Sequence, residues 1–481
     1  MRLTTSDVVH LINNIEQSFD VKEWKINDIR VWPIIRLTLA FSLDSISDKK
    51  KYTDKKSIVF HLIGFSKTLF YNLFHWYSLK KTTILFITYS SAKHNKIKEK
   101  WFDSYLDPIA NILEKNKISY QFLEYDGNYD FRFSSFHKFK IIQYHLFYNL
   151  IKARYSEKKV LIDEFSINLI ENINKYLINK GLSNFLLTEN LVRKKVSQII
   201  FNNVYFTKLL QMCKPSVVIG SNYYGIEMAL NLACRKMNIK SIDIQHGVQG
   251  DYHVAYGSWK KIPETGYDLL PDIFAVWSEE EKKVIDKWAE GTYHKAKIIG
   301  HPMRNYLAIA KGQNRISERK NCKINVLITL QTGRGFIKLY KELLEFNNHQ
   351  IFWFIRKHPT MGTKEQREIK KELSFYNKSI YNYENASDEV LFDLLERIDI
   401  HISENSSVVI EAAQYGIPTI LVHESGKDLY EREILSGKAF FITQPQQIIE
   451  KINSLKSHKN PFAKSLDYSQ FEERIIAMIK D

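Results

Sequence analysis

The sequence predicts an α/β protein built from two doubly wound domains, with a helical region in front of them. Two series of apolar strand patterns alternate with helical patterns, and a polar stretch from Lys311 to Asn321 separates the series. Small polar residues follow several strand patterns, which is typical of the cleft edge of an open α/β sheet. A chain of 481 residues has room for both domains and for a cleft.

The same patterns divide the chain into four expected parts. They are a helical N-terminal region (1–80), an N-terminal α/β domain with a helical insertion (81–305), a C-terminal α/β domain (320–440) and a final helical part (441–481).

Composition excludes several classes of protein. The formal net charge is +15, but acidic residues are interspersed among the lysines, so we expect no nucleic-acid partner. Cys213, Cys234 and Cys322 lack the spacing of a disulfide framework or a zinc site, which favours a reducing cytoplasm. The first residues, Met1 to His10, contain no apolar core of signal-peptide length, so export is not expected.

Two segments combine aromatic and apolar residues with flanking cations. Ser57 to Leu79 is interrupted by polar residues and is therefore not predicted to span a membrane. Phe139 to Tyr155 has the same character. Both segments suit peripheral contact with an anionic membrane, and packing against a neighbouring domain is the alternative.

The first α/β series begins with strand patterns at Ile84 to Thr88 and Tyr120 to Tyr125, around a helical pattern at Pro108 to Glu114. A later strand pattern, Ser216 to Gly220, stops at Ser221-Asn222. We expect these two polar residues on the acceptor side of a cleft.

A histidine follows the next strand pattern, Ser241 to Ile244, in the sequence Gln245-His246-Gly247. A histidine there can take a proton from a hydroxyl group, and the glycine lets a substrate approach the backbone. Contact with a phosphate and simple packing are the alternatives for His246. Gln245 joins the expected acceptor side. Asp251 is the second catalytic candidate, and Asp243 and His253 are nearby polar alternatives.

The series ends with a strand pattern at Ile273 to Trp277, a helix from Glu279 to Trp288 capped by Ser278, and a short strand pattern at Lys297 to Ile299. Gly300-His301-Pro302 then punctuates the chain before the polar stretch.

The second series opens with the strand pattern Ile324 to Leu330, followed by Gln331-Thr332-Gly333-Arg334-Gly335. The amides of this turn and the Arg334 guanidinium could hold a phosphate or diphosphate, and a plain turn is the alternative. The turn lacks the Lys-Ser/Thr ending of a P-loop, so ATP hydrolysis is not indicated.

A second histidine follows the strand pattern Ile351 to Ile355, in Arg356-Lys357-His358-Pro359. The X-Pro step ends the strand and directs His358 toward the edge of the sheet. With two cations before it, His358 suits an anionic leaving group; a histidine held by the backbone is the alternative.

The most informative segment follows the strand pattern Ile398 to Ser403. Ser406 and Ser407 are N-cap residue types that open a short helix, whose first amides can turn to a phosphate. Glu411 shares the face of Ser407 and could accept hydrogen bonds from ribose hydroxyls. An ordinary βαβ turn is the alternative.

These motifs resemble bacterial GT-B glycosyltransferases of surface (capsule or lipopolysaccharide) polysaccharide synthesis. His358-Pro359 and Ser406-Ser407 are similar to the His-Pro and Ser-Ser motifs of capsule Kdo transferases and polysialyltransferases. Gln245-His246-Gly247 is similar to the aromatic-His-Gly element of CDP-glycerol glycerophosphotransferases, with Gln245 in place of the aromatic residue. Asp126 is the match to the acidic base of the sialyltransferases, and Trp32-Pro33 with Arg36 is similar to the start of surface-polysaccharide proteins.

The resemblance implies a GT-B-like fold, in which two Rossmann-like domains face each other across a cleft and the final helices return to the first domain. It implies a nucleotide-sugar donor on the C-terminal domain and a glycan or lipid-linked acceptor on the N-terminal one. His358 and the paired serines would contact the donor phosphate, and His246 would be the base. No metal or cofactor is implied, and the expected place is the cytoplasm, with peripheral contact at the inner membrane.

Three other functions fit parts of the sequence. A polyol-phosphate transferase of the CDP-glycerol type would use the same motifs. A non-hydrolysing UDP-GlcNAc 2-epimerase shares the two-domain plan and needs no acceptor. A protein that binds anionic polymers would use the +15 charge and leave the polar strand ends without a role.

Overall fold

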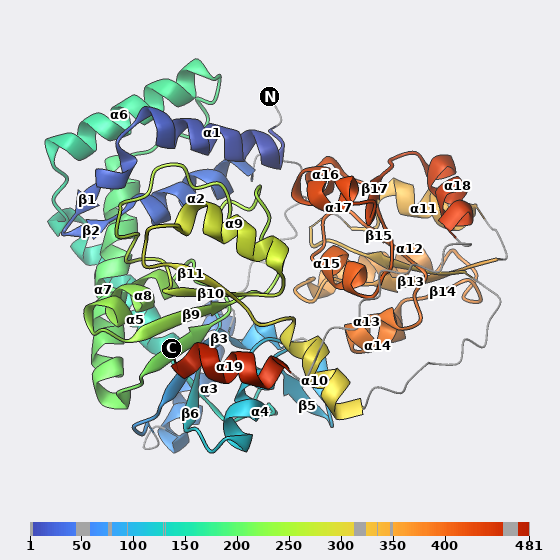
Figure 1. Ribbon diagram of the computed structural model, residues 1–481, viewed down its shortest axis with the longest axis horizontal. Helices are drawn as coiled ribbons and strands as arrows, with labels where there is room; N and C mark the ends of the chain where they lie inside the picture. Colours follow the sequence, from blue (N-terminus) through green and yellow to red (C-terminus); the bar gives the residue numbers. More distant parts are fainter. Residues whose placement is uncertain are drawn as a thin grey trace.

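Two parallel β-sheets, each covered by helices, form the two lobes of the molecule (Figure 1). The computed structural model describes residues 3–44, 58–75, 79–93, 95–127, 129, 131–311, 324–333, 335–346, 350–455 and 470–480.

The first sheet has seven strands, all parallel. In chain order they are β3 (Ile84–Tyr89), β6 (Tyr120–Tyr125), β7 (Phe139–Ile141), β8 (Val217–Gly220), β9 (Lys240–Ile244), β10 (Ile273–Val276) and β11 (Lys295–Ile298). In space they run β11-β10-β9-β8-β3-β6-β7, so the direction of winding reverses between β3 and β8. Strands β8 and β10 are buried along their whole length and β3 at all but its last residue, which explains why their sequences are continuous apolar runs.

The second sheet has six strands, again all parallel. They are β12 (Ile324–Thr329), β13 (Ile351–Arg356), β14 (Tyr381–Asn382), β15 (Ile400–Ser403), β16 (Thr419–Leu421) and β17 (Ala439–Phe441). Their spatial order is β14-β13-β12-β15-β16-β17, with the reversal between β12 and β15. Numbered within the domain this order is 3-2-1-4-5-6, that of a dinucleotide-binding fold, and the first sheet repeats it with one extra strand. The predicted fold class, two Rossmann-like domains in a GT-B-like arrangement, is confirmed.

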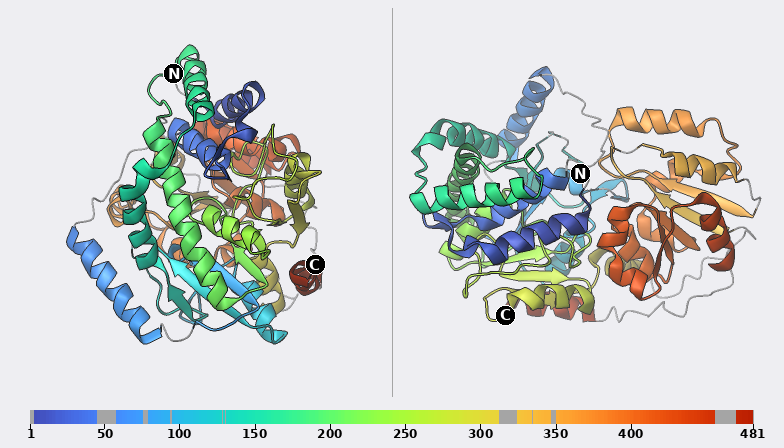
Figure 2. Two further views of the ribbon diagram at one scale, coloured as in Figure 1. Left: turned by 90° about the vertical axis from the view of Figure 1, so that its left-hand side faces the viewer. Right: turned by 90° about the horizontal axis from the view of Figure 1, so that it is seen from above.

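Helices cover both faces of each sheet (Figures 1 and 2). In the first lobe they are α4 (Asp107–Lys115), α5 (Gln143–Ser156), α6 (Glu164–Asn179), α7 (Glu189–Cys213), α8 (Glu227–Lys236), α9 (Glu279–Ala289) and α10 (Pro302–Lys311). In the second they are α11 (Lys338–Glu345), α12 (Thr363–Leu373), α13 (Glu384–Asp388), α14 (Leu391–Leu395), α15 (Val408–Gln414), α16 (Glu424–Leu429) and α17 (Glu431–Leu435). Ser278 caps α9 as predicted, because its hydroxyl accepts from the amide of Glu280. A short antiparallel hairpin, β4 (Asn95–Ile97) with β5 (Lys100–Phe102), lies between β3 and α4.

The N-terminal region contains α1 (Thr5–Ser18), α2 (Trp32–Asp44) and α3 (Ile58–His75). The prediction of a purely helical region was wrong at one point, since β1 (Lys25–Ile26) and β2 (Ile29–Arg30) form a hairpin. Its turn residues, Asn27 and Asp28, both have positive φ, the geometry that tight hairpins require and that these residue types tolerate. The apolar faces of α1 and α2 belong to the same core as α7 and α8, so this region is part of the first lobe.

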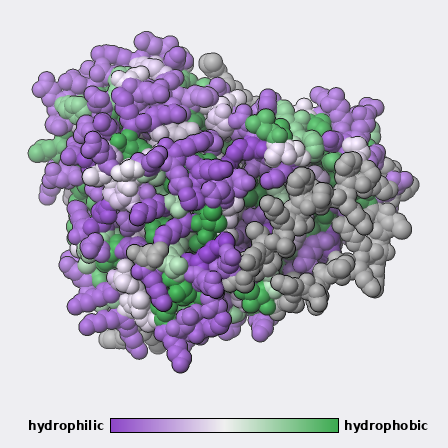
Figure 3. Space-filling view, in the orientation of Figure 1, coloured by the Kyte–Doolittle hydropathy of each residue, from purple (hydrophilic) through white to green (hydrophobic). Residues whose placement is uncertain are grey.

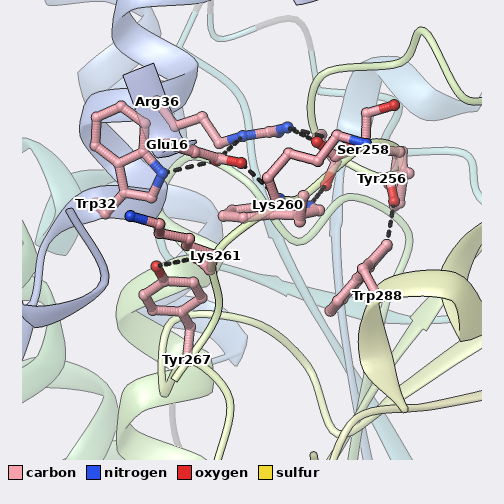
Figure 4. Close-up of polar contacts among 12 residues, drawn as sticks. Glu16, Trp32, Arg36, Tyr256, Ser258, Lys260, Lys261, Tyr267 and Trp288 are labelled. Atoms are coloured by element: carbon pink, nitrogen blue, oxygen red, sulfur yellow. Dashed lines mark hydrogen bonds and ion pairs between the residues drawn. The ribbon is translucent and has the colours of Figure 1, made fainter. Parts of the chain in front are cut away.

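A buried polar network fixes α1 and α2 to the loop that follows β9 (Figure 4). Glu16 and Arg36 are both fully buried, and Arg36 Nε donates to Glu16 Oε1 at 2.8 Å. The same carboxylate accepts from the Trp32 indole at 2.8 Å and from the amide of Lys260 at 2.7 Å. Removing one partner of such a pair typically lowers stability by about 3–5 kcal/mol, because the other charge is left buried and uncompensated. The network therefore fixes the N-terminal helices to the first lobe.

The final part of the chain is divided between the lobes, which corrects the prediction that residues 441–481 return together to the first domain. Helix α18 (Pro445–Leu455) packs Ile448 and Ile452 into the core of the second lobe. Helix α19 (Gln470–Lys480) packs Phe471 and Ile475 into the core of the first lobe, beside α4.

Candidate active site

A cavity of about 510 Å³ lies between the lobes, where strands of both sheets end. From the first lobe its walls include residues that follow β3, β8, β9 and β11, and from the second lobe residues that follow β12, β13 and β15. Ligands of open α/β sheets bind at this edge, near the reversal of the strand order. We call this cavity the cleft.

The cleft collects seven of the predicted site residues, although they lie far apart in the chain: Ser221 and His246 from the first lobe, and His358, Pro359, Ser406, Ser407 and Glu411 from the second. The lobes approach closely here, because a Cβ atom added to Gly247 would lie 3.7 Å from the Cβ atom of Ser407. The loop that carries His246 therefore faces the loop that carries the paired serines.

His246 occupies the turn after β9. Burial lowers the pKa of His246 to about 4, so the imidazole is neutral near neutral pH. Its Nδ1 atom is buried and has no hydrogen-bond partner among the described residues. A neutral imidazole with an uncommitted nitrogen can accept a proton from a hydroxyl group placed in the cleft.

His358 lies opposite, after β13. Its Nδ1 accepts from the amide of Thr360 at 3.2 Å and lies 2.9 Å from the Thr360 hydroxyl. Since Nδ1 accepts a backbone hydrogen bond, Nε2 carries the proton in the neutral form. Burial lowers the pKa of His358, which favours this neutral form. His358 can thus donate a hydrogen bond to an oxygen atom in the cleft.

The serine loop runs from Ser403, at the end of β15, to Val408. Ser403 Oγ accepts from the amide of Ser406 at 3.0 Å, and Ser406 Oγ accepts from the amide of Val408 at 3.3 Å. Ser407 occupies the N-cap position of α15 without a side-chain capping bond, contrary to one of the two predicted caps. Its hydroxyl makes no hydrogen bond within the described part of the chain and can donate to a ligand.

Glu411 and His301 form a buried pair that joins the lobes. Both are nearly inaccessible, and His301 Nε2 lies 4.0 Å from Glu411 Oε1. Burial raises the pKa of Glu411 to about 8 and lowers that of His301 to about 3. His301 packs against Trp277 and Phe392, with ring centroids 4.2 and 4.7 Å apart. Near neutral pH the pair therefore holds one proton, mainly on Glu411.

Two cationic residues, Arg356 and Lys357, directly precede His358 in the chain. Arg356 is buried, and its guanidinium donates to the carbonyl oxygens of Ala386 and Glu389. Burial lowers the pKa of Arg356 only to about 10, so it stays charged. Lys357 forms an ion pair with Asp388 at 3.1 Å. Because the histidines are neutral, these two residues supply the positive charge of the second-lobe wall.

Three predicted residues of the first lobe do not line the cleft. Asp251 pairs with Lys287 at 2.9 Å outside the cleft, and its assignment as a catalytic residue stays a prediction. Gln245 is fully buried, donating to the carbonyl of Gly247 at 2.8 Å and accepting from the amide of Trp277 at 2.7 Å. It shapes the turn that presents His246 and does not contact the cavity. Asn222 also lies outside the cavity walls, whereas Ser221 is part of them.

The amides of the glycine turn after β12 bind a side chain of the protein, where a phosphate was predicted. The amides of Gly333 and Gly335 both donate to the buried carboxylate of Glu365, at 2.9 and 3.0 Å. An internal anion thus fills the place assigned to a phosphate, and Gly333 does not line the cleft. Arg334 lies outside the described residues.

The structure adds residues that the sequence analysis did not assign to the site. His301 lines the cleft, and so do Tyr105 and Tyr89. His253, which the sequence analysis named as a polar alternative near His246, lines it too. A signal for His301 was present, because His301-Pro302 follows a strand in the same way as His358-Pro359. Tyr105 had no such signal: its place depends on Asp103, whose carboxylate accepts from the amide of Tyr105 at 2.9 Å, just before α4.

Within the part of the chain that the structure describes, no group of three or more His, Cys, Asp or Glu side chains is arranged to hold a metal ion. The expectation of chemistry without metal or cofactor stays a prediction.

Comparisons with known proteins gave matches only among solved structures. No protein-family model and no curated protein matches the sequence. The UDP-GlcNAc 2-epimerase from Neisseria meningitidis bound to UDP-GlcNAc matches 82% of this chain and 98% of its own, with 14% identity and a TM-score of 0.49. The UDP-GlcNAc 2-epimerase from Methanocaldococcus jannaschii matches 82% and 99%, with 14% identity and a TM-score of 0.46. Acinetobacter baumannii MurG matches 83% and 99%, with 12% identity and a TM-score of 0.42.

The raised pKa of Glu411 predicts a pH-dependent effect of Glu411→Gln. Between the ordinary value of 4.5 and about 8, the unfolded chain releases a proton that the folded protein keeps, so the wild type loses stability as pH rises through this window. A glutamine side chain has no proton to lose, so the melting temperature of Glu411→Gln should rise relative to wild type from pH 5 to pH 8. Scanning calorimetry at several pH values measures this difference.

The surface substitution Glu23→Gln is the control and should show a smaller change over the same range, since Glu23 is about half exposed (54%). A difference between Glu411→Gln and wild type that stays constant with pH would mean that Glu411 is ionised in the folded protein, with its proton on His301.

Proposed function

We propose that the protein is a glycosyltransferase that moves a sugar from a nucleotide-sugar donor to a glycan or lipid-linked acceptor, in the synthesis of a bacterial surface polysaccharide. The observation that carries the proposal is the convergence of His246 with His358 and the paired serines on one cavity between two Rossmann-like domains. A proton acceptor and a set of phosphate-binding groups on opposite walls suit group transfer at a carbon atom between them.

The second-lobe wall is suited to the donor diphosphate. His358 offers Nε2–H, Ser407 offers its hydroxyl, and Arg356 adds a buried positive charge. Such donors stabilise the charge that develops on a departing phosphate, and they act strongly because the site is enclosed. A bound diphosphate would also raise the pKa of His358 and strengthen this contact. Glu411, one turn into α15, would accept hydrogen bonds from ribose hydroxyls.

The first-lobe wall is suited to the acceptor. In the proposed step the acceptor hydroxyl gives its proton to a ring nitrogen of His246, and its oxygen forms a bond to the anomeric carbon. The bond between that carbon and the phosphate oxygen breaks, and the electron pair leaves with the nucleoside diphosphate. The low pKa of the buried His246 keeps it unprotonated and ready for this role. The step uses only residues of this chain and the two substrates.

The epimerase hypothesis is the principal alternative, since it needs the same donor wall and no acceptor. Incubation with UDP-GlcNAc alone separates the two: an epimerase converts it to UDP-ManNAc, whereas a transferase leaves the sugar unconverted. Incubation with CDP-glycerol and an acceptor tests the polyol-phosphate hypothesis in the same format.

The donor wall generates a prediction for nucleotide binding. One of CMP, CDP, UDP, GDP and dTDP should raise the melting temperature, because a ligand that binds only the folded state stabilises it. His358→Ala and Ser406→Ala should abolish the shift, since both change the second-lobe wall. His246→Ala should keep the shift and lower turnover by about a hundredfold or more. Thermal-shift measurements and product detection check these outcomes.

The surface substitution His10→Ala is the control for losing a histidine and should change neither readout. An unchanged shift in both His358→Ala and Ser406→Ala would place the donor elsewhere, and normal turnover of His246→Ala would remove it as the base.

We also propose peripheral contact with the cytoplasmic face of an anionic membrane, through a surface formed by α3 and α5. No helix among the described residues combines the length and apolar character needed to cross a bilayer. Helix α3 projects from the first lobe (Figure 2), and Phe65 on α3 contacts Phe147 on α5. Exposed apolar side chains on the two helices include Phe70, 62% exposed, and Tyr155, 83% exposed, with exposed lysines and an arginine among them. Much of the face drawn in Figure 3 is hydrophilic instead. The lysines before α3 lie outside the described residues.

This surface predicts binding to vesicles that contain phosphatidylglycerol, and weaker binding to phosphatidylcholine vesicles, because apolar insertion and charge attraction add. Phe70→Asp should lower the co-sedimenting fraction, whereas Phe375→Asp, on an exposed phenylalanine of the second lobe, should not. Equal co-sedimentation of wild type and Phe70→Asp would contradict the assignment.

A further inference from the structure

A second cavity, of about 490 Å³, lies between the N-terminal helices and the second lobe. On one side it is lined by residues of α1, α2 and the loop from Tyr252 to Val254. On the other side it is lined by the serine loop, the residues that follow β16, and α16. Its volume is in the range of cavities that bind small molecules. We call it the side cavity.

Apolar and aromatic side chains make up about half of the residues that line the side cavity, and polar side chains the other half. Val8 and Val9 of α1 and Ala40 of α2 are buried and line it. From the second lobe, the buried Val422 and the partly buried Leu429 line it. This apolar part of the wall favours an alkyl group.

The polar residues of the side cavity include two at its junction with the cleft. His253 lines both cavities, and Asn405 adjoins Ser406 of the cleft wall. The rings of His253 and His246 both flank Tyr224, with centroids 6.5 and 6.3 Å from it. His253 therefore lies at the boundary between the side cavity and the cleft, near the candidate base.

Both lobes are needed to form the side cavity. The amide of Ser6 on α1 donates to Asp428 of α16 at 3.0 Å, which ties the N-terminal helix to the second lobe. The buried Glu16–Arg36 pair fixes α1 and α2 to the first lobe. A ligand in the side cavity would thus contact both lobes, as a ligand in the cleft would.

We propose that the side cavity binds the apolar chain of an acceptor whose sugar or polyol head lies in the cleft at His246. The acceptor class is an amphiphile, in which a hydroxyl-bearing head is joined to an alkyl or isoprenyl chain. This inference rests on the proposed function for the role of the head, and on the side cavity for the chain. On this proposal the N-terminal helices α1 and α2 select lipid-linked acceptors over free ones.

The test compares two probes with the same head, n-octyl β-D-glucoside below its micelle concentration and methyl β-D-glucoside, by isothermal titration calorimetry. Wild type should bind the octyl probe about tenfold or more tightly than the methyl probe, since burying methylene groups is favourable. Phe41→Asp, at the half-exposed (49%) edge of the side cavity, should remove this preference, and so should Val9→Trp, which fills it.

Phe165→Asp is the matched control, because Phe165 is 43% exposed and does not line the side cavity. It should bind both probes as wild type does. The thermal shift produced by the stabilising nucleotide should persist in Phe41→Asp, which shows that this variant folds and that its donor site is intact.

Equal affinity for the two probes in wild type, or an unchanged preference for the octyl probe in Phe41→Asp, would overturn the inference. If a nucleotide still stabilises the protein in that case, the proposed function is not contradicted. Octyl-probe binding that Phe41→Asp removes, in a protein that no nucleotide stabilises, would support the side cavity and reject the proposed function.

Discussion

The close approach of the two strand-end loops is the constraint on which the candidate site depends. The turn after β9 and the loop after β15 belong to different sheets, yet Gly247 and Ser407 lie nearly in contact. His246 belongs to the first lobe, whereas His358 and the serine loop belong to the second. The site thus depends on whatever holds the lobes together: the contact of α1 with α16, the return of α19 to the first lobe, and the packing of His301 against Phe392 of the second lobe.

Burial sets the electrostatics of this site. The cleft histidines have lowered pKa values and are neutral, and Glu411 has a raised pKa and keeps its proton, so the fixed charge comes from Arg356 and Lys357. A wall of neutral donors with two cations behind it is well matched to a diphosphate, which brings its own negative charge. The same burial leaves His246 unprotonated, as a base must be before it receives a proton.

The sequence could predict the strands and the residues at their ends because parallel strands are buried on both faces and stop where polar residues begin. It placed His246, His358 and Ser406 at one edge on that basis, and all three line one cavity. It could not show that Glu365, some 30 positions away, accepts hydrogen bonds from the amides of Gly333 and Gly335, because that contact is set by tertiary packing. The two-residue strands of the N-terminal hairpin are too short for a periodic signal. The similar amphipathic patterns of α18 and α19 do not encode which lobe each helix covers.

A crystal structure of the protein with its stabilising nucleoside diphosphate tests the central claim most directly. The account predicts phosphate oxygens within hydrogen-bond distance of His358 Nε2 and of the Ser406–Ser407 loop, with the ribose near Glu411 and the terminal phosphate facing His246. A diphosphate bound outside the space between the lobes, with neither His358 nor the serine loop in contact, would contradict it.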